Sequence, residues 1–199
     1  YVEWAGPGLH KVVADWTLIE TADDADAFAD RVAAGRISAA IGTSISGVLD
    51  WAAGAFESNG FAGMRRVIDV SGDGPNNAGD GVEAARDRAL ARGITINGLP
   101  LMMKAVDGPF SLRELDVYYE DCVTGGPLSF VLPLWRLEAF AETVRRKLIL
   151  EIAGLAPPPA PRLMRAQLGL GPAVREPRID CFIGEKRRAR WMRERGWEW

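Results

Sequence analysis

A turn rich in oxygen-bearing side chains follows a short apolar run near the middle of the chain. Residues 67–79 read VIDVSGDGPNNAG, so the turn holds a serine, two aspartates, two asparagines and three glycines. Glycine-rich turns can cradle phosphate, a serine after a strand can act as a nucleophile, and carboxylate and hydroxyl oxygens can bind a divalent cation. These three kinds of site are the alternatives for this turn.

The spacing of the turn residues disfavours a phosphate cradle. Gly72, Gly74 and Gly79 do not follow the G-x-G-x-x-G pattern, and the turn has no G-K-[ST] sequence. Asp73 would also direct a negative charge at the phosphate group. We therefore expect no nucleotide site of the usual kind in this turn.

A serine nucleophile is also disfavoured. Ser71 lies in VSGDG, which differs from the G-x-S-x-G pattern, and the only histidine is His10, near the N-terminus. Because the usual triad needs a histidine beside the serine, we predict no such triad.

A divalent-cation site fits the residue types better. Mg²⁺ prefers hard oxygen ligands and keeps several waters, so a few side chains on neighbouring loops suffice. Thr43, at the start of a predicted helix, and Asp73, at the end of a predicted strand, supply such oxygens. Both side chains also have a simple structural interpretation, since threonine caps helices and aspartate bonds to turn amides.

Periodicity predicts alternating strands and helices that position these loops. Apolar alternation and turn signals predict an N-terminal hairpin, and 3.6-residue periodicity predicts the helices. Asp80 and Glu83 form a capping-box pattern at one helix start. The predicted strands are 1–6, 10–19, 65–70, 94–102 and 129–134, and the predicted helices are 21–35, 42–58, 80–93, 111–123 and 137–154. This order predicts an α/β, Rossmann-like fold with a doubly wound, mostly parallel sheet and an antiparallel edge hairpin.

The last predicted helix carries an apolar stripe that we expect to pack on the sheet. The stripe consists of Leu137, Phe140, Ala141, Val144, Leu148 and Ile152. In the strand 65–70, Asp69 is unusual, because a carboxylate in a central strand needs a partner or a place near the strand end.

Composition divides the chain into a body, a linker and a tail. The 199 residues are 48% hydrophobic, which is ample for one packed domain, here residues 1–154. A proline-rich linker covers 155–178, and a basic tail rich in Trp and Arg covers 179–199. Residues 1–156 carry 14 Lys and Arg against 22 Asp and Glu, whereas residues 157–199 carry 10 against 5. No apolar run is long enough to span a membrane.

The two cysteines predict neither a disulfide framework nor a metal site. Cys122 and Cys181 are far apart and lack metal-ligand spacing. We expect each to be a small buried side chain or an ordinary thiol, which leaves the compartment open.

The order of motifs resembles that of a von Willebrand factor A domain, and more narrowly an uncharacterised bacterial family of such domains. The resemblance runs through GTSISGVL, RRVIDVSGDGPNN, ARGITINGLPLM and TGGPLSFVLPL, over roughly residues 1–154. It implies a metal-ion-dependent adhesion site in which Thr43 and Asp73 are the cation ligands. Ser44, Ser71 and Asn76 would line the rim of that site.

One part of the family pattern is missing from this chain. The resemblance implies a first strand that ends in D-x-S-x-S, yet the chain starts at what would be the second strand. We therefore expect an N-terminally truncated domain whose cation site is degenerate or incomplete. In such a site, Mg²⁺ binds weakly unless the carboxylate of a partner completes its shell.

The function we predict is protein binding through an adhesion-type module, with no enzymatic activity. The partner would be another protein, with an acidic side chain that reaches the cation, and no nucleic acid is expected. The alternative is a nucleotide- or phosphate-handling α/β enzyme that uses the turn 71–79. Periplasmic or secreted localisation is expected if a signal peptide was lost upstream, and cytoplasmic localisation otherwise.

Overall fold

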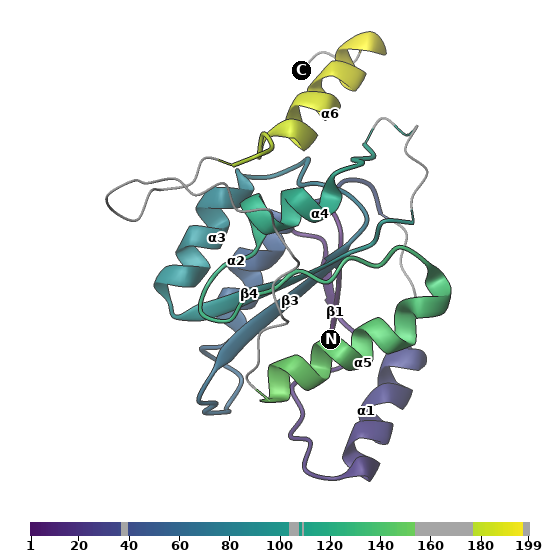
Figure 1. Ribbon diagram of the computed structural model, residues 1–199. Coiled ribbons are helices and arrows are strands. Elements are labelled where there is room, and N and C mark those ends of the chain that lie inside the picture. Colours follow the sequence, from purple (N-terminus) through teal and green to yellow (C-terminus); the bar gives the residue numbers. More distant parts are fainter. Residues whose placement is uncertain (37–39, 104–107, 109, 154–176, 197–199) are drawn as a thin grey trace, which may run out of the picture.

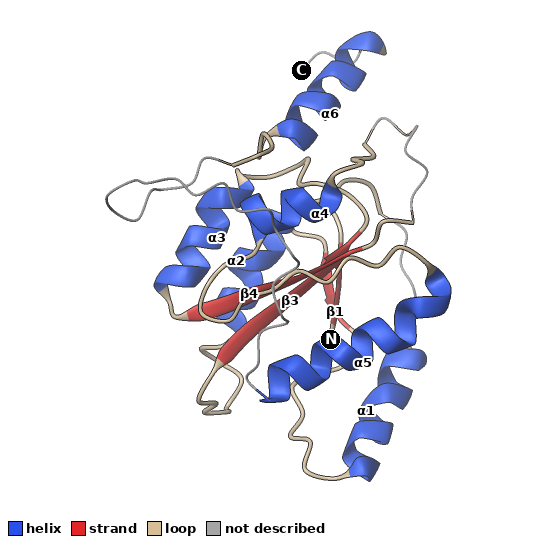
Figure 2. Cartoon of the chain, viewed as in Figure 1, coloured by secondary structure: helices blue, strands red, loops and turns tan. Residues whose placement is uncertain are grey.

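The computed structural model describes residues 1–36, 40–103, 108, 110–153 and 177–196. Helices and strands are mixed along the chain, and the fold is of the α/β class (Figures 1 and 2). The elements are β1 (Val2–Trp4), β2 (His10–Val12), α1 (Ala22–Ala33), α2 (Ile45–Ala55), β3 (Arg66–Gly72), α3 (Val82–Ala91), β4 (Ile94–Pro100), α4 (Leu115–Tyr118), η1 (Tyr119–Val123), η2 (Leu137–Ala139), α5 (Phe140–Ala153) and α6 (Ile183–Glu194).

Two separate pairs of strands replace the single sheet expected from the sequence. β1 and β2 form the predicted antiparallel hairpin, with Glu3 opposite Lys11. β3 and β4 are parallel along their whole length, from Arg66 opposite Ile94 to Gly72 opposite Pro100. Within the described part of the chain, no ladder joins the two pairs.

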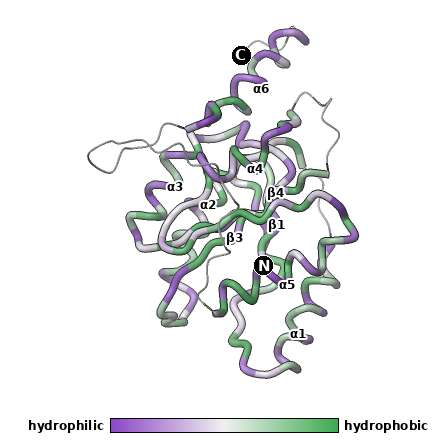
Figure 3. The backbone as a smooth tube through the Cα atoms, viewed as in Figure 1, coloured by the Kyte–Doolittle hydropathy of each residue, from purple (hydrophilic) through white to green (hydrophobic). Residues whose placement is uncertain are grey.

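The main core lies on one face of the parallel pair. Side chains alternate between the faces of a strand, so Ile68 and Val70 point to one side and Asp69 to the other. The core side meets α2, α3 and the α4–η1 segment. The strands at the centre of Figure 3 are correspondingly coloured as hydrophobic.

The opposite face meets α5 through polar groups, so the expected packing of its apolar stripe is wrong. Lys147 of α5 is only 7% exposed and lies 2.7 Å from Asp69 of β3. Leu137 and Ile152 of the stripe are 68% and 86% exposed. The carboxylate of Asp69 needs a cation, which favours the lysine face of the helix over the apolar one.

Two local predictions also need correction. Gly81, and not Asp80, is the N-cap residue of α3, and glycine has no side chain that could accept a hydrogen bond. Asp80 and Glu83 therefore form no capping box. The predicted strand 129–134 is reduced to single bridges, from Val131 to Gly98 and from Leu134 to Leu101. Pro133 lies between these bridges and has no N–H to donate to a continuous ladder. Most of the predicted linker 155–178 lies outside the described residues.

Candidate functional site

Two adjacent asparagines join the turn after β3 to the loop before α2. The side-chain oxygen of Asn77 accepts a hydrogen bond of 2.8 Å from the Thr43 amide, and the Asn77 amide donates back to the Thr43 carbonyl at 2.8 Å. The side-chain oxygen of Asn76 accepts a bond of 3.0 Å from the amide of Ser46 in α2. The two loops that carry the predicted cation ligands are therefore held together by these bonds.

The five predicted site residues fall into two groups. Ser44 and Asn76 are buried, and both are used inside the protein, since Ser44 also caps α2 through the Gly47 amide. Ser71 and Asp73 are exposed, and Thr43 is half-buried. Thr43, Ser71 and Asp73 are therefore at least partly accessible to solvent, whereas Ser44 and Asn76 position the loops.

A groove of about 1430 Å³ runs from these loops along the inner edges of β1 and β3. Thr43, Asp73 and Asn77 line the groove together with Arg188 of α6. The rest of its wall is largely aromatic and aliphatic, and includes Trp4, Trp16, Phe28, Val48, Trp51 and Ala52. The predicted cation ligands thus face a common space.

Most backbone N–H groups of the two loops already donate hydrogen bonds to acceptors within the protein. The amides of residues 43, 44, 46 and 47 bond to Asn77, Ala5, Asn76 and Ser44 in turn. In the turn after β3, the amides of residues 76, 77 and 78 bond to Tyr118 or to Thr43. Because a phosphate cradle needs free amides directed at the anion, this arrangement is poorly suited to phosphate.

A buried hydroxyl without a partner lies beside the end of β3. The side chain of Tyr119 is fully buried, and its hydroxyl forms no hydrogen bond with the described residues. A Cβ placed on Gly72 would lie 2.8 Å from this hydroxyl, and one on Gly98 would lie 2.7 Å from the ring, so both strands need glycine here. Burial, and then the charge of Asp73, raise the pKa of Tyr119. The hydroxyl therefore stays protonated and has a proton to donate near Asp73.

The C-terminal helix α6 packs directly on the turn. The side-chain amide of Asn76 donates to Glu185 at 2.6 Å and to the carbonyl of Asp80 at 3.0 Å. Gly184 is required at this contact, because a Cβ there would lie 1.9 Å from the Asn76 carbonyl oxygen. Trp191 lies against Phe110, with ring centroids 5.4 Å apart. The sequence favours a solvated tail whose tryptophans fold back on the domain, and the Trp191–Phe110 contact agrees with this, but sequence reasoning did not place the tail on the candidate site.

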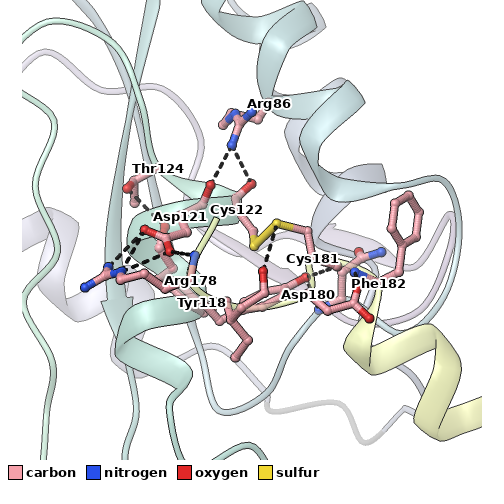
Figure 4. Close-up of a disulfide and its surroundings, with 12 residues drawn as sticks. Arg86, Tyr118, Asp121, Cys122, Thr124, Arg178, Asp180, Cys181 and Phe182 are labelled. Carbon is pink, nitrogen blue, oxygen red and sulfur yellow. Dashed lines mark hydrogen bonds and ion pairs between the residues drawn. A yellow bond between two sulfur atoms is a disulfide. The ribbon is translucent and has the colours of Figure 1, made fainter. Parts of the chain in front are cut away.

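A disulfide between Cys122 and Cys181 joins η1 to the segment just before α6 (Figure 4). Both cysteines are buried, as one of the two expectations had it, but the expectation of ordinary thiols is wrong. Tyr118, next to the bond, donates to the Cys181 carbonyl at 3.2 Å, and Arg178 pairs with Asp121 at 2.9 Å (Figure 4). The segment that precedes α6 is thus held to the body by one covalent and several polar contacts.

A second polar cluster lies under α5, on the far face of the parallel pair. Lys147 bridges Asp69 and Glu151, at 2.7 and 3.2 Å, and Asn97 of β4 donates to Glu151 at 3.2 Å. Burial, and then the nearby carboxylate of Asp69, raise the pKa of Glu151 to about 7. This cluster explains the unusual Asp69 of the sequence as a partner of a buried lysine.

The residues present fit a divalent cation only in part. Among the residues that the structure describes, no group of three or more His, Cys, Asp or Glu could hold a metal ion. Thr43 and Asp73 offer two oxygens at the groove, so other ligands would have to come from water or from a partner. No helix in the described ranges is long and apolar enough to cross a membrane.

Comparison with known proteins gives one match. The model of a family described as "Protein of unknown function (DUF1194)" matches residues 1–156. No curated protein and no solved structure matches the chain.

Proposed function

Because the chain belongs to the DUF1194 family, whose function is unknown, we propose a role from its own residues: it is a protein-binding module with an incomplete divalent-cation site. Thr43 and Asp73 are the protein ligands in this proposal, and Ser71 contributes to the rim. Ser44 and Asn76 are buried beneath the loops, and their hydrogen bonds hold the loops in place.

One observation carries this proposal. Thr43 and Asp73 line one groove together with Ser71. Mg²⁺ takes hydroxyl and carboxylate oxygens and fills the rest of its shell with water, so these side chains could form part of such a shell.

The same geometry supports a protein partner with an acidic side chain. Two protein oxygens leave most of the six positions around Mg²⁺ to water. A carboxylate from a partner would replace one water and would also neutralise Arg188, which lines the groove beside Thr43. The resemblance to von Willebrand factor A domains supports the same role, and we propose that relationship as the origin of the fold.

A phosphate-handling enzyme is the second candidate, and Arg188 is the observation in its favour. The Nη1 atom of Arg188 lies 3.1 Å from where a Cβ on Gly42 would be, so α6 brings a cation to the loop. The internally bonded amides of residues 43, 44, 46 and 47 argue against it, since they offer no cradle. We therefore prefer the binding module.

The disulfide bears on the compartment in which this module acts. Disulfides persist in oxidising compartments and are rare in the cytosol. The bond between Cys122 and Cys181 thus favours a periplasmic or extracellular role.

Thermal and chemical unfolding with added Mg²⁺ or Mn²⁺ tests the proposal. A cation that binds only the folded chain raises the unfolding free energy by about 1.4 kcal/mol at ten times its dissociation constant. Asp73→Ala should abolish this gain, while Asp80→Ala, on the same turn and exposed, should keep it. Stabilisation by nucleotide or phosphate that needs no metal and survives Asp73→Ala would favour the enzyme instead.

A further inference from the structure

A second cavity, of about 480 Å³, lies between α6 and the segment that leads into α4. On α6 it is lined by residues 187, 190, 191 and 194, which are three and four positions apart and so share one face of the helix. The neighbouring face carries Arg188 and Met192, which line the groove, and Trp191 borders both spaces. The described lining of this second cavity, here called the α6 cavity, contains neither Thr43 nor Asp73.

Contacts with the body of the protein hold α6 in place at this cavity. The guanidinium of Arg187 donates a hydrogen bond to the Ser111 carbonyl. Trp191 packs edge-on against Phe110, with 5.4 Å between the ring centroids, and the guanidinium of Arg195 lies over the Trp191 ring at 4.6 Å. Two walls from distant parts of the sequence are thus fixed relative to each other, as in a preformed small-molecule site.

Arginines without an acidic partner gather around the α6 cavity. Arg113 comes from the segment before α4, and Arg187 and Arg190 come from α6. In the described part of the chain none of these three forms an ion pair, whereas Arg88 and Arg178 pair with carboxylates at 2.6 and 2.9 Å. Like charges repel each other, so an anion bound among the three guanidinium groups would be stabilised.

A buried hydroxyl on the cavity wall indicates the same kind of ligand. Ser111 lines the cavity and is only 5% exposed. Its Oγ atom is buried and forms no hydrogen bond with the described residues. Such a hydroxyl loses its bonds to water on folding, and an acceptor oxygen of a ligand in the cavity would restore one of them.

Two glutamates in the same lining indicate that the ligand also carries a positive charge. Glu114 and Glu194 are exposed, and neither forms an ion pair with a described residue. Three arginines against two glutamates leave the lining with an excess of one positive charge, which disfavours a polyanion such as nucleic acid. A small ligand with an anionic group and an ammonium group would meet both kinds of side chain.

We propose that the α6 cavity binds a small phosphate ester that carries an ammonium group. A carboxylate offers two oxygens in one plane, whereas the tetrahedral phosphate can meet guanidinium groups on both walls and the Ser111 hydroxyl as well. Glu114 and Glu194 then contact the ammonium group. The volume of about 480 Å³ is that of a site for a small organic molecule and exceeds what a bare ion needs. The inference does not require the cation site.

Isothermal titration calorimetry on the full chain tests this inference, with the disulfide intact and in a chloride buffer without divalent cations or other oxyanions. The probes are phosphoethanolamine, ethyl phosphate, which lacks the ammonium group, and ethanolamine, which lacks the phosphate. We expect phosphoethanolamine to bind roughly threefold to fivefold more tightly than ethyl phosphate, and ethanolamine not to bind.

The same chemistry occurs free in solution and in a lipid headgroup. Vesicles of phosphatidylcholine with phosphatidylethanolamine are therefore titrated beside the free compound, and vesicles of pure phosphatidylcholine serve as their control. Selective binding of the free compound or of the mixed vesicles supports the proposal and identifies the source.

Substitutions on both walls locate the site. Arg113→Gln and Arg190→Gln should each weaken the binding of phosphoethanolamine by about tenfold or more. Arg193→Gln, exposed on α6 outside the cavity lining, should keep the parent affinity, and so should Arg188→Gln, on the groove. Glu194→Gln should reduce the preference for phosphoethanolamine over ethyl phosphate. Circular dichroism checks that each variant is folded.

Four results would overturn the inference. These are no binding of either source; equal affinity of the parent chain for phosphoethanolamine and ethyl phosphate; parent affinity retained in both Arg113→Gln and Arg190→Gln; and loss of binding in Arg188→Gln alone, which would place the phosphate in the groove. Since no divalent cation is present, these results leave the Mg²⁺ test of Thr43 and Asp73 untouched.

Discussion

The side-chain amide of Asn76 donates a hydrogen bond of 2.6 Å to Glu185, 109 residues further along the chain. Asn76 is fully buried and also bonds to Ser46 and to Asp80, so it connects α2, the turn after β3 and α6. The C-terminal helix is therefore part of the candidate site.

Glu185→Ala should destabilise the chain. The substitution leaves a buried amide hydrogen of Asn76 without its acceptor, which costs about 1 to 2 kcal/mol of unfolding free energy. Urea unfolding followed by tryptophan fluorescence measures it. Glu194→Ala, exposed at the end of the same helix, is the matched control and should change little. Equal effects of the two variants would contradict the packing of α6 on the turn.

Removing the hydroxyl group should affect the unfolding free energy differently at the two neighbouring tyrosines, Tyr118 and Tyr119. Tyr118 accepts from the Asn76 amide and donates to Cys181, so Tyr118→Phe should cost about 1 to 2 kcal/mol. The Tyr119 hydroxyl is buried without a described partner, so Tyr119→Phe should leave stability unchanged or raise it by about 1 kcal/mol. Chemical unfolding in EDTA compares them. A large loss in Tyr119→Phe would reveal a partner for that hydroxyl.

Removal of the disulfide should lower stability strongly. Cys122 and Cys181 close a loop over a sequence separation of 59, for which the chain-entropy relation gives about 4 kcal/mol. The double variant Cys122→Ala with Cys181→Ala should lose about 2 to 4 kcal/mol in denaturant unfolding. Dithiothreitol should have the same effect on the parent chain and none on the variant. An unchanged parent chain would show that the bond does not form in solution.

The sequence predicts the local parts of this fold well. The hairpin, α1 and β4 follow from periodicity and turn signals, which act over a few residues. Asp73 follows the parallel strand β3, as the rule for ligand loops leads one to expect, whereas the loop of Thr43 follows no described strand and reaches the same groove through its bonds to Asn77.

The long-range parts could not be predicted in this way. The disulfide and the Asn76–Glu185 bond join segments on either side of the proline-rich stretch, and no periodicity reports such pairing. The orientation of α5 was predicted from its apolar stripe alone. The requirement of Asp69 for a cation, met by Lys147, turns the helix the other way. Pairing of buried charges is a constraint that hydrophobic patterns do not contain.

Glu151 should make stability depend on pH. Its ordinary pKa is 4.5, and burial together with Asp69 raises the pKa to about 7 in the folded chain. A raised carboxyl pKa means that the folded state holds the proton more tightly than the unfolded state. The resulting stabilisation is fully present below about pH 4.5 and is lost as the pH rises through about 7. We therefore expect this group to favour folding at pH 5 over pH 8 by on the order of 1 to 2 kcal/mol, allowing for solvent screening.

Glu151→Gln tests this assignment, because glutamine keeps the shape and the acceptor but cannot titrate. Urea unfolding from pH 4.5 to 8 should show a smaller fall in stability with rising pH in Glu151→Gln than in the parent chain. Glu142→Gln, exposed in the first turn of the same helix, should retain the parent profile. Lys147 and Asp69 face Glu151, so Asp69→Asn should also flatten the profile, by removing the carboxylate that raises its pKa. An unaltered profile in both Glu151→Gln and Asp69→Asn would place the pH dependence elsewhere in the molecule.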